Sequence, residues 1–341
     1  MRSRLAGRQN RTMPQVSGAP TLISPGTAER LDAHRRPLLG HCYRMLGSPF
    51  EAEDAVQETM LRAWRGMGHF DGRSELRTWL HRIATNVCLD MLKGRQRRAV
   101  PMDLGPAQAP VAENLRTRHE TAWIEPIPGH ALAEPDPADA VVAGESIRLA
   151  FIAALQHLPP KQRAVLILCE VLHWRASEVA ELLDMSVPSV NSALQRARAT
   201  LATRSLARDD ADGDARVADQ EVLRRYVDAF QRYDLDALTA IIHHDATQSM
   251  PPYDMWIAGR NDIFAWWYGP GSGCRGSRLL PAGTANGSPA YGQYKPNPGG
   301  GYDPWALQVV EINDGRVAQL TFFLDTARLF PLFALPPRID P

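Results

Sequence analysis

Seven prolines fall between residues 101 and 139, where they interrupt any long helix. This segment separates two stretches with helical spacing, residues 27–100 and 140–208. The remaining stretch, residues 209–341, has a different pattern, and 341 residues are more than twice the length of a typical domain. The sequence therefore predicts several folded units joined by a proline-rich linker.

Composition excludes several classes of protein. Hydrophobic residues at 44% and charged residues at 22% are close to the globular average, which excludes a wholly disordered, collagenous or coiled-coil chain. No apolar run reaches the ~18 residues of a membrane span, and the arginine-rich start lacks the apolar core of a signal peptide. We therefore expect a cytoplasmic protein without a membrane partner. Four dispersed cysteines predict neither disulfides nor a metal site: Cys42, Cys88, Cys169 and Cys274.

The net charge of zero conceals segregation along the chain. Residues 1–100 carry 17 basic and 9 acidic side chains, and residues 141–208 carry 8 and 5. Residues 101–140 carry 2 basic and 7 acidic side chains, and residues 209–341 carry 11 and 17. Two basic blocks separated by an acidic one favour two polyanion-binding units and a third unit of another kind.

The first basic block contains a predicted helix over residues 51–64. Apolar spacing predicts that Val56, Met60, Ala63 and Trp64 form its buried stripe. A second face could dock a basic partner helix, or it could be an ordinary solvated face. That face carries Asp54, Gln57, Glu58 and Leu61.

A second predicted helix, residues 74–93, presents residue types that suit single-stranded DNA. Arginine and lysine neutralise phosphates, asparagine pairs with base edges, and tryptophan stacks on unpaired bases. An ordinary core position for Trp79 is the alternative. The predicted core positions are Leu76, Leu80, Ile83, Ala84 and Val87. The candidate DNA-binding residues are Trp79, Arg82, Asn86, Lys93, Arg95, Arg97 and Arg98.

The second basic block contains a predicted helix-turn-helix, formed by helices over residues 177–183 and 187–201. A strongly apolar run over residues 161–172 precedes these two helices, and Ser186 is the predicted N-cap of the second one. The inward positions of the last helix are Val190, Leu194, Ala197 and Leu201. The outward, candidate DNA-reading positions are Ser189, Asn191, Ser192, Gln195, Arg196 and Arg198. A helical hairpin without DNA binding is the alternative.

The third unit has an α+β pattern. A helix over residues 220–242 is followed by strand-like runs at 305–312 and 317–324, which the turn Asn313-Asp314-Gly315 separates. Acid-base candidates are His243, His244, Asp245 and Asp254. The candidate residues of a ligand cavity are Trp256, Phe264, Trp266 and Trp267. Structural roles for these residues are the alternative.

Residues 51–64 and 77–86 strongly resemble region 2 of bacterial extracytoplasmic-function sigma factors, and residues 158–163 and 190–198 resemble their region 4. The segments 226–230, 243–252 and 309–324 resemble the SnoaL-like branch of the nuclear-transport-factor-like fold, which forms the tail of a subgroup of these sigma factors. The resemblance implies two all-α domains followed by an α+β cone. The implied boundaries are a disordered tail 1–26, σ2 27–100, an acidic linker 101–139, σ4 140–208 and a SnoaL-like regulatory domain 209–341.

The resemblance implies a promoter-specificity subunit that melts the −10 element, has no enzymatic activity and needs no cofactor. Its partners would be promoter DNA and core RNA polymerase, which it would grip at the β′ clamp helices and the β flap; an anti-sigma factor is possible but not required. Asp54, Gln57 and Glu58 would meet the clamp helices. Trp79 and Asn86 would read flipped −10 bases, and Ser192 and Arg196 would face the −35 groove.

Two departures from the family pattern weaken the implied −35 grip: Asn191 stands at a position that is usually basic, and Ala193 replaces a frequent arginine. The acidic linker could follow the path of the RNA, or it could be a flexible solvated connector. Two other functions stay open. One is an enzyme whose C-terminal domain acts on a small apolar molecule, and the other is a stand-alone repressor of duplex DNA.

Overall fold

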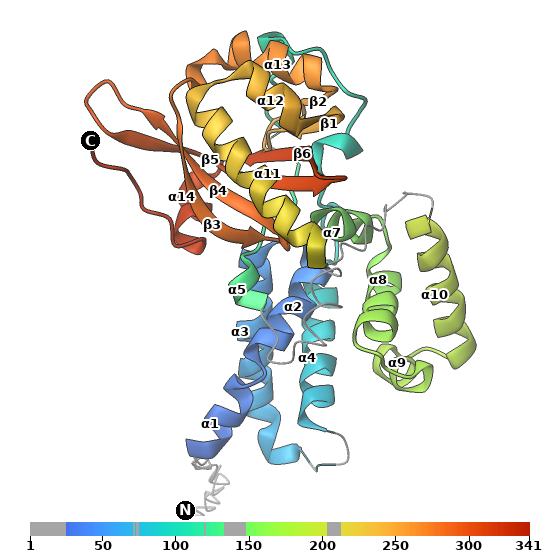
Figure 1. The fold of residues 1–341 in the computed structure, drawn as a ribbon. Helices are drawn as coiled ribbons and strands as arrows, with labels where there is room; N and C mark the ends of the chain where they lie inside the picture. The colour runs from blue at the N-terminus through green and yellow to red at the C-terminus, as the bar shows by residue number, and fades with distance from the viewer. Residues whose placement is uncertain (1–24, 71, 73–74, 119–120, 133–147, 203–212) are drawn as a thin grey trace, which may run out of the picture. The chain divides into compact units, whose positions relative to one another are not determined.

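The computed structural model describes residues 25–70, 72, 75–118, 121–132, 148–202 and 213–341 (Figure 1). Helix α1, Pro25–Asp32, belongs to a separate unit that comprises residues 1–33. Most of the expected N-terminal tail and the end of the linker lie outside the described residues.

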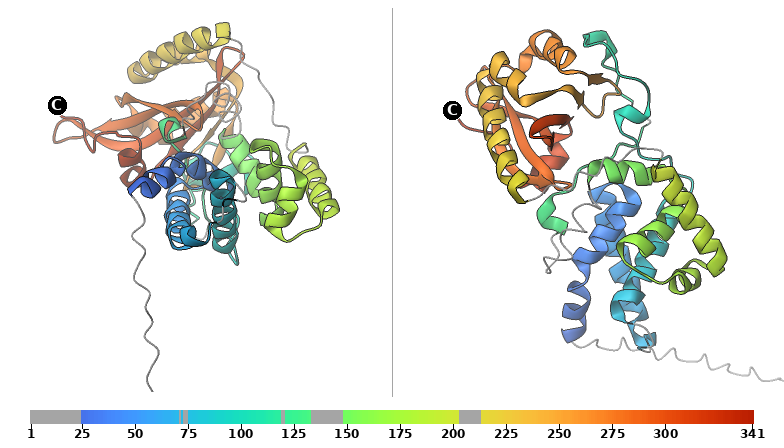
Figure 2. Two further views of the ribbon diagram at one scale, coloured as in Figure 1. Left: turned by 90° about the horizontal axis from the view of Figure 1, so that it is seen from below. Right: turned by 45° about the vertical axis from the view of Figure 1, so that its right-hand side comes forward.

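The first basic block folds into a bundle of three mutually packed helices (Figure 2). These are α2, Arg35–Leu46, α3, Pro49–Gly66, and α4, Leu76–Met91, with a 3₁₀ turn η1 over Met67–His69. Gly47 ends α2 in the left-handed conformation, with φ +71°, and its amide donates to the Tyr43 carbonyl. Ser48 then caps α3, because its hydroxyl oxygen accepts from the Glu51 amide at 3.4 Å. The tight connection makes α2 and α3 antiparallel neighbours.

The buried face of α3 is not quite the predicted stripe. Val56 and Ala63 are buried as expected, but Met60 is half-buried and the Trp64 side chain is 43% exposed. The prediction for Trp64 is wrong because small residues, which let α2 and α4 approach closely, fill the buried face instead. That face carries Ala52, Ala55, Val56, Thr59 and Ala63.

On α4 the predicted core is largely found. Leu80, Ala84 and Val87 are buried, whereas Leu76 and Ile83 are half-buried.

The described part of the linker packs against the domains. It contains the 3₁₀ turns η2, Pro101–Asp103, and η3, Ala112–Asn114, and the short helix α5, Gly129–Leu132. Ile124 and Ile127 are fully buried. Isolated bridges join Trp123 to Ala99, Thr117 to Tyr253 and Pro128 to Ala285. A solvated connector, one of the two interpretations of this segment, is therefore wrong for these residues, because apolar side chains anchor them.

The second basic block is also helical. Its elements are α7, Leu149–Gln156, α8, Pro160–Leu166, a π-helical turn η4, Ile167–Val171, α9, Ala176–Leu183, and α10, Val187–Ala202. Helices α9 and α10 form the predicted helix-turn-helix, with Asp184 in the left-handed conformation between them. The Ser186 hydroxyl accepts from the Ser189 amide at 3.3 Å, which confirms the predicted N-cap. Val190 and Ala197 are buried, and Leu194 and Leu201 are half-buried.

The third unit is an α+β domain around one six-stranded sheet, with strand order β2-β1-β6-β5-β4-β3. Strands β1 and β6 are parallel, and the other neighbouring pairs are antiparallel. Helix α11 lies across one face of the sheet (Figures 1 and 2). The strands are β1, Ile242–Ser249, β2, Trp256–Ala258, β3, Arg278–Ala285, β4, Ser288–Pro296, β5, Tyr302–Asn313, and β6, Arg316–Phe323. The helices are α11, Gly213–Arg232, α12, Leu235–Ile241, α13, Arg260–Tyr268, η5, Pro270–Cys274, and α14, Thr326–Leu332.

Local turn chemistry explains where these elements begin and end. The predicted β5–β6 hairpin is present, and Asp314 and Gly315 both have the positive φ that its tight turn requires. The single helix predicted over 220–242 is instead two helices. Tyr233 takes a φ of +59° between them, and the Asp234 carboxylate accepts from the Ala237 amide at 3.0 Å to cap α12.

A pair of buried imidazoles between α2 and α4 makes the first bundle sensitive to acid. The rings of His41 and His81 lie 5.4 Å apart, and His41 contacts the Thr85 hydroxyl at 2.9 Å. Burial lowers the pKa of His81 from 6.5 to about 4 and that of His41 well below its ordinary value. Both rings are therefore neutral in the folded bundle.

Because the folded-state pKa values lie below the unfolded ones, these histidines stabilise the fold fully above about pH 6.5 and lose that contribution as the pH falls toward 4. We expect His81 alone to remove about 3 kcal/mol of unfolding free energy over that window. His81→Gln should flatten the fall in urea stability between pH 7 and pH 4.5. Substitution of the exposed His130 by Gln is the control, and an unchanged slope in the His81 variant would contradict this explanation.

Candidate functional site

The predicted polymerase-facing side of α3 is open to solvent. Asp54 and Gln57 are exposed, and the Leu61 side chain is 52% exposed. Glu58 is half-buried and pairs with Arg62 at 2.7 Å. The four residues thus lie along one accessible face that is both acidic and apolar.

The structure adds one aromatic side chain, Trp64, which the sequence pattern did not assign to this face. Trp64 joins Leu61, Gln57, Met60 and Arg35 around a hollow of about 510 Å³. Because the apolar spacing of this helix predicts Trp64 as a core residue, only its exposure in the structure identifies it as a surface residue.

On α4, the predicted base-reading residues lie on successive turns. The Trp79 ring is half-buried and stacks on Phe70, with ring centres 5.0 Å apart. Gly66 allows this placement, because a β-carbon there would lie 3.2 Å from the indole. Asn86 is exposed. Trp79 therefore takes a position between the two predicted alternatives, held by one aromatic neighbour yet reachable from solvent.

Arg82, on the same side of α4, contacts the helix-turn-helix. Its guanidinium donates to the Glu181 carboxylate of α9 at 2.9 Å. Lys93, two residues after the end of α4, pairs with Asp90 at 2.7 Å. The helix expected to meet DNA is thus tied to the second helical unit in this arrangement.

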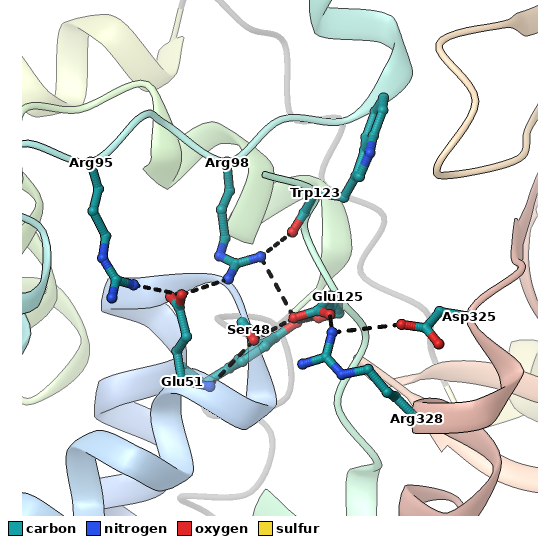
Figure 3. Close-up of polar contacts among 9 residues, drawn as sticks. Ser48, Glu51, Arg95, Arg98, Trp123, Glu125, Asp325 and Arg328 are labelled. Carbon is teal, nitrogen blue, oxygen red and sulfur yellow. Dashed lines mark hydrogen bonds and ion pairs between the residues drawn. The ribbon is translucent and has the colours of Figure 1, made fainter. Parts of the chain in front are cut away.

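The basic run after α4 also binds carboxylates of the chain itself (Figure 3). Arg95 and Arg98 pair with Glu51 at 2.6 and 3.0 Å. Arg98 additionally lies 3.6 Å from the carboxylate of Glu125 and donates to the Trp123 carbonyl. These arginines therefore hold the linker against the start of α3.

Glu125 of the linker joins groups from three parts of the chain (Figure 3). Its carboxylate accepts from the Ser48 hydroxyl and, at 2.6 Å, from Arg328 of α14, and it is ion-paired with Arg98 at 3.6 Å. The Glu125 side chain is only 16% exposed. A carboxylate with so little exposure to solvent needs such partners, because burial without them disfavours its charged form.

A second, uncharged contact lies beside Glu125. The buried Tyr43 hydroxyl donates to the Glu125 carbonyl at 2.8 Å and accepts from the Asn286 amide at 2.8 Å. Asn286 also exchanges backbone and side-chain bonds with Ile127. Burial raises the pKa of Tyr43, so its hydroxyl keeps its proton. The β3–β4 turn is thereby bonded to α2 and to the linker.

The outward face of α10 matches the prediction in exposure. All six candidate residues are exposed: Ser189, Asn191, Ser192, Gln195, Arg196 and Arg198. Arg198 is ion-paired with Glu170, and the hydroxyls of Ser189 and Ser186 lie 2.8 Å apart. The other four side chains are open to solvent.

In the third domain the proposed cavity residues do not share one environment. Trp266 and Trp267 belong to the buried core, where Trp267 packs against Phe230 and donates to Gln248 at 2.7 Å. Phe264 is half-buried against that core. Trp256 instead donates to the Gly105 carbonyl of the linker at 2.9 Å.

The acid-base candidates are also separated. Asp254 is buried and accepts from Arg118 of the linker at 2.6 Å. His243, His244 and Asp245 form a cluster on β1, in which His244 and Asp245 are exposed. A general acid and base in one cavity is therefore not what these four residues form.

Three family models match successive parts of the chain. They are Sigma-70 region 2 over residues 31–98, Sigma-70 region 4 over residues 148–201 and a SnoaL-like domain over residues 223–320. Their order and spacing follow the three structural units described above.

Curated relatives agree with these matches. The ECF RNA polymerase sigma factor SigG of Mycobacterium tuberculosis is 45% identical over 312 residues, which cover 89% of this chain and 82% of the relative. The ECF RNA polymerase sigma factor SigW of Bacillus subtilis is 30% identical over 174 residues, 51% of this chain and 86% of the relative.

A solved structure shows the same fold over nearly the whole chain. The crystal structure of the M. tuberculosis extracytoplasmic function sigma factor SigJ covers 91% of this chain and 99% of its own, with a TM-score of 0.59 at 24% identity. Among the described helices, none is long and apolar enough to cross a membrane. With the fold, the three domain matches and a relative 45% identical along most of its length, the chain belongs to the extracytoplasmic-function RNA polymerase sigma factors.

Proposed function

We propose that the chain directs core RNA polymerase to promoters through the open faces of α3, α4 and α10, and that its C-terminal domain restrains this activity through the linker. The observation that carries the proposal is the use of the same arginines for two purposes. Arg82, Arg95 and Arg98, which suit DNA phosphates, here pair with Glu181, Glu51 and Glu125.

The α3 face supplies the contact with core polymerase. Its exposed acidic and amide groups suit a basic partner helix, and Leu61 beside Trp64 offers apolar area that a partner can bury. Asp54, Gln57, Glu58 and Leu61 are the proposed contacts with the β′ clamp helices, while the β flap would be met by the second helical unit.

The α4 face supplies −10 recognition. Trp79 provides a stacking surface for an unpaired base and Asn86 a bidentate partner for a base edge. The surrounding cations would neutralise the backbone phosphates, which offsets the cost of holding bases outside the stack. These cations are Arg82, Lys93, Arg95, Arg97 and Arg98.

The α10 face supplies −35 recognition, because a recognition helix of this geometry enters the major groove. Ser192, Gln195 and Arg196 are the proposed base contacts, and Ser189, Asn191 and Arg198 would approach the phosphates or neighbouring bases. Asn191 carries no charge where relatives are usually basic, so we expect a weaker backbone grip.

Control in cis follows from Glu125 and Tyr43. They bond the linker to α2, α3 and α14 together, so the SnoaL-like domain is held beside the promoter-binding bundle. Because the tether keeps the effective concentration high, DNA must compete with the chain's own carboxylates. An anti-sigma factor is then not required for restraint, although the open α3 and α10 faces leave room for one.

A regulatory role of the C-terminal domain, without turnover, fits its interior better than an enzymatic role. Four buried polar side chains of the core bond to one another, in a chain from Tyr226 through Gln308 and Gln293 to Ser277. The Oδ2 atom of Asp254 accepts from Arg118 of the linker.

Asn86→Ala tests promoter reading without disturbing the fold, because the side chain is exposed. Loss of one bidentate base contact costs about 1–3 kcal/mol, so open-complex formation should fall by roughly 5-fold to 150-fold while core binding is kept. Run-off transcription and permanganate footprinting on a cognate promoter measure this. Asn261→Ala, an exposed asparagine of α13, is the matched control. Equal output from the two variants would refute the assignment.

Glu125→Ala tests the restraint. Removal of this carboxylate leaves Arg98 and Arg328 without their shared partner, and we expect a loss of about 2 kcal/mol in urea unfolding. Promoter binding per folded molecule should rise, because the linker loses its bonds to Ser48 and Arg328 and holds the C-terminal domain less firmly beside the first bundle. Glu113→Ala, an exposed carboxylate of the same linker, should change neither quantity.

A truncation after Leu206 complements that substitution by removing the C-terminal domain altogether. Transcription from several promoters should then differ from that of the full chain. Identical output from the full and truncated chains across all promoters would exclude control in cis.

A further inference from the structure

A small cavity lies where the first bundle, the linker and the second helical unit meet. It has a volume of about 260 Å³. Four arginines and one carboxylate contribute to its lining: Arg95, Arg97, Arg98, Arg163 and Glu51. Its wall therefore carries more positive than negative side chains, drawn from both helical units.

Two of these arginines lack a carboxylate partner among the described residues. The Arg163 guanidinium donates to the Met45 carbonyl, to the side-chain and backbone carbonyls of Gln156 and to the Leu158 carbonyl. Arg97 contacts the ring of His157. Glu51, by contrast, is shared by Arg95 and Arg98. The uncompensated charge of the cavity thus rests on Arg97 and Arg163.

Arg163 is an unusual residue to bury without an anion. It is 3% exposed, and burial lowers its pKa only to about 10, so it remains a cation at neutral pH. Isolated buried charges are strongly disfavoured, and four neutral acceptors do not supply the opposite charge. An anion bound in the cavity would supply that charge.

Two buried donors in the cavity wall also have no acceptor. The Nε of Arg163 and the Nε2 of Gln156 are buried and make no hydrogen bond among the described residues, and Gln156 is itself only 3% exposed. The orientation of Gln156 is fixed, because its Oε1 accepts from Arg163 at 2.6 Å and only its NH₂ group remains. Buried donors of this kind are normally satisfied.

We propose that this cavity is a binding site for a phosphate or diphosphate group that bridges the two helical units. A phosphate offers several acceptor oxygens in divergent directions, which suits guanidinium groups and an amide donor placed around it. The volume is below the 300–1,000 Å³ of sites that enclose a whole drug-sized ligand, so the rest of the ligand would lie outside. A soluble nucleotide or the DNA backbone can supply such a group.

Calorimetric titration of the full chain with inorganic pyrophosphate at low salt tests the site. Binding should weaken about tenfold in Arg97→Gln, because one charge-assisted contact is lost from an exposed side chain. Arg316→Gln removes the same charge from an exposed position in the C-terminal domain and should bind as the unaltered chain does.

Gln156→Glu is the sharper variant, because Arg163 substitutions risk loss of the fold. The new carboxylate pairs with Arg163 and repels the ligand, so pyrophosphate binding should fall by more than about tenfold while circular dichroism stays native. Absence of binding to the unaltered chain, equal loss in Arg97→Gln and Arg316→Gln, or equal affinity for malonate would overturn the proposal.

The same variants distinguish the source of the phosphate. If the DNA backbone supplies it, pyrophosphate and promoter DNA compete, and Gln156→Glu weakens both. If a soluble nucleotide supplies it, Gln156→Glu removes pyrophosphate binding and leaves the affinity for a promoter fragment unchanged. Failure of promoter recognition altogether, with pyrophosphate binding retained, would count against the proposed function and leave the phosphate site standing.

Discussion

The arrangement of this chain depends on how one nearly buried carboxylate is compensated. Glu125 lies in a proline-rich linker, yet its carboxylate is compensated by Ser48, Arg98 and Arg328, which come from three different parts of the fold. A carboxylate at this depth is unfavourable unless such donors surround it. The need for all three donors at once fixes where the linker runs and which domains it touches.

The charges on the basic side of the first bundle also need compensation. A sigma factor must offer cations to DNA, but neighbouring cations also repel, and Arg95, Arg97 and Arg98 lie within four consecutive residues. Glu51 and Glu125 neutralise two of them in the free chain. On the proposed function, DNA phosphates would take over this neutralisation, so that one set of arginines would serve the chain both with and without DNA.

Local signals made much of this fold predictable. Helical spacing identified α3, α4 and α10, the Ser186 cap and the Asn313–Gly315 turn were read directly from residue types, and family motifs assigned the order of domains. The exposure of Trp64 and the break at Tyr233 were missed, because tertiary packing overrides local spacing at both positions.

The contacts that join the domains could not be predicted in the same way. Glu125 and Arg328 are 203 residues apart, and Tyr43 and Asn286 are 243 apart. No periodicity relates such positions, since their pairing depends on how whole domains pack. The site residues proposed for polymerase and promoter DNA rest on family motifs and exposure and remain predictions.

Differences in burial set the order in which the restrained arrangement can open. The Arg82–Glu181 pair is largely solvent-exposed, and pairs of that kind contribute about 0–1 kcal/mol. Glu125 and Arg163 are held by several bonds in nearly dry surroundings, so their separation costs more. The α4 face therefore loses its contact with α9 first, while Arg163 still joins α8 to the end of α2. On the proposed function, that step would give Trp79 and Asn86 room for DNA without separation of the two helical units, and the contacts of Glu125 and Arg163 would yield later.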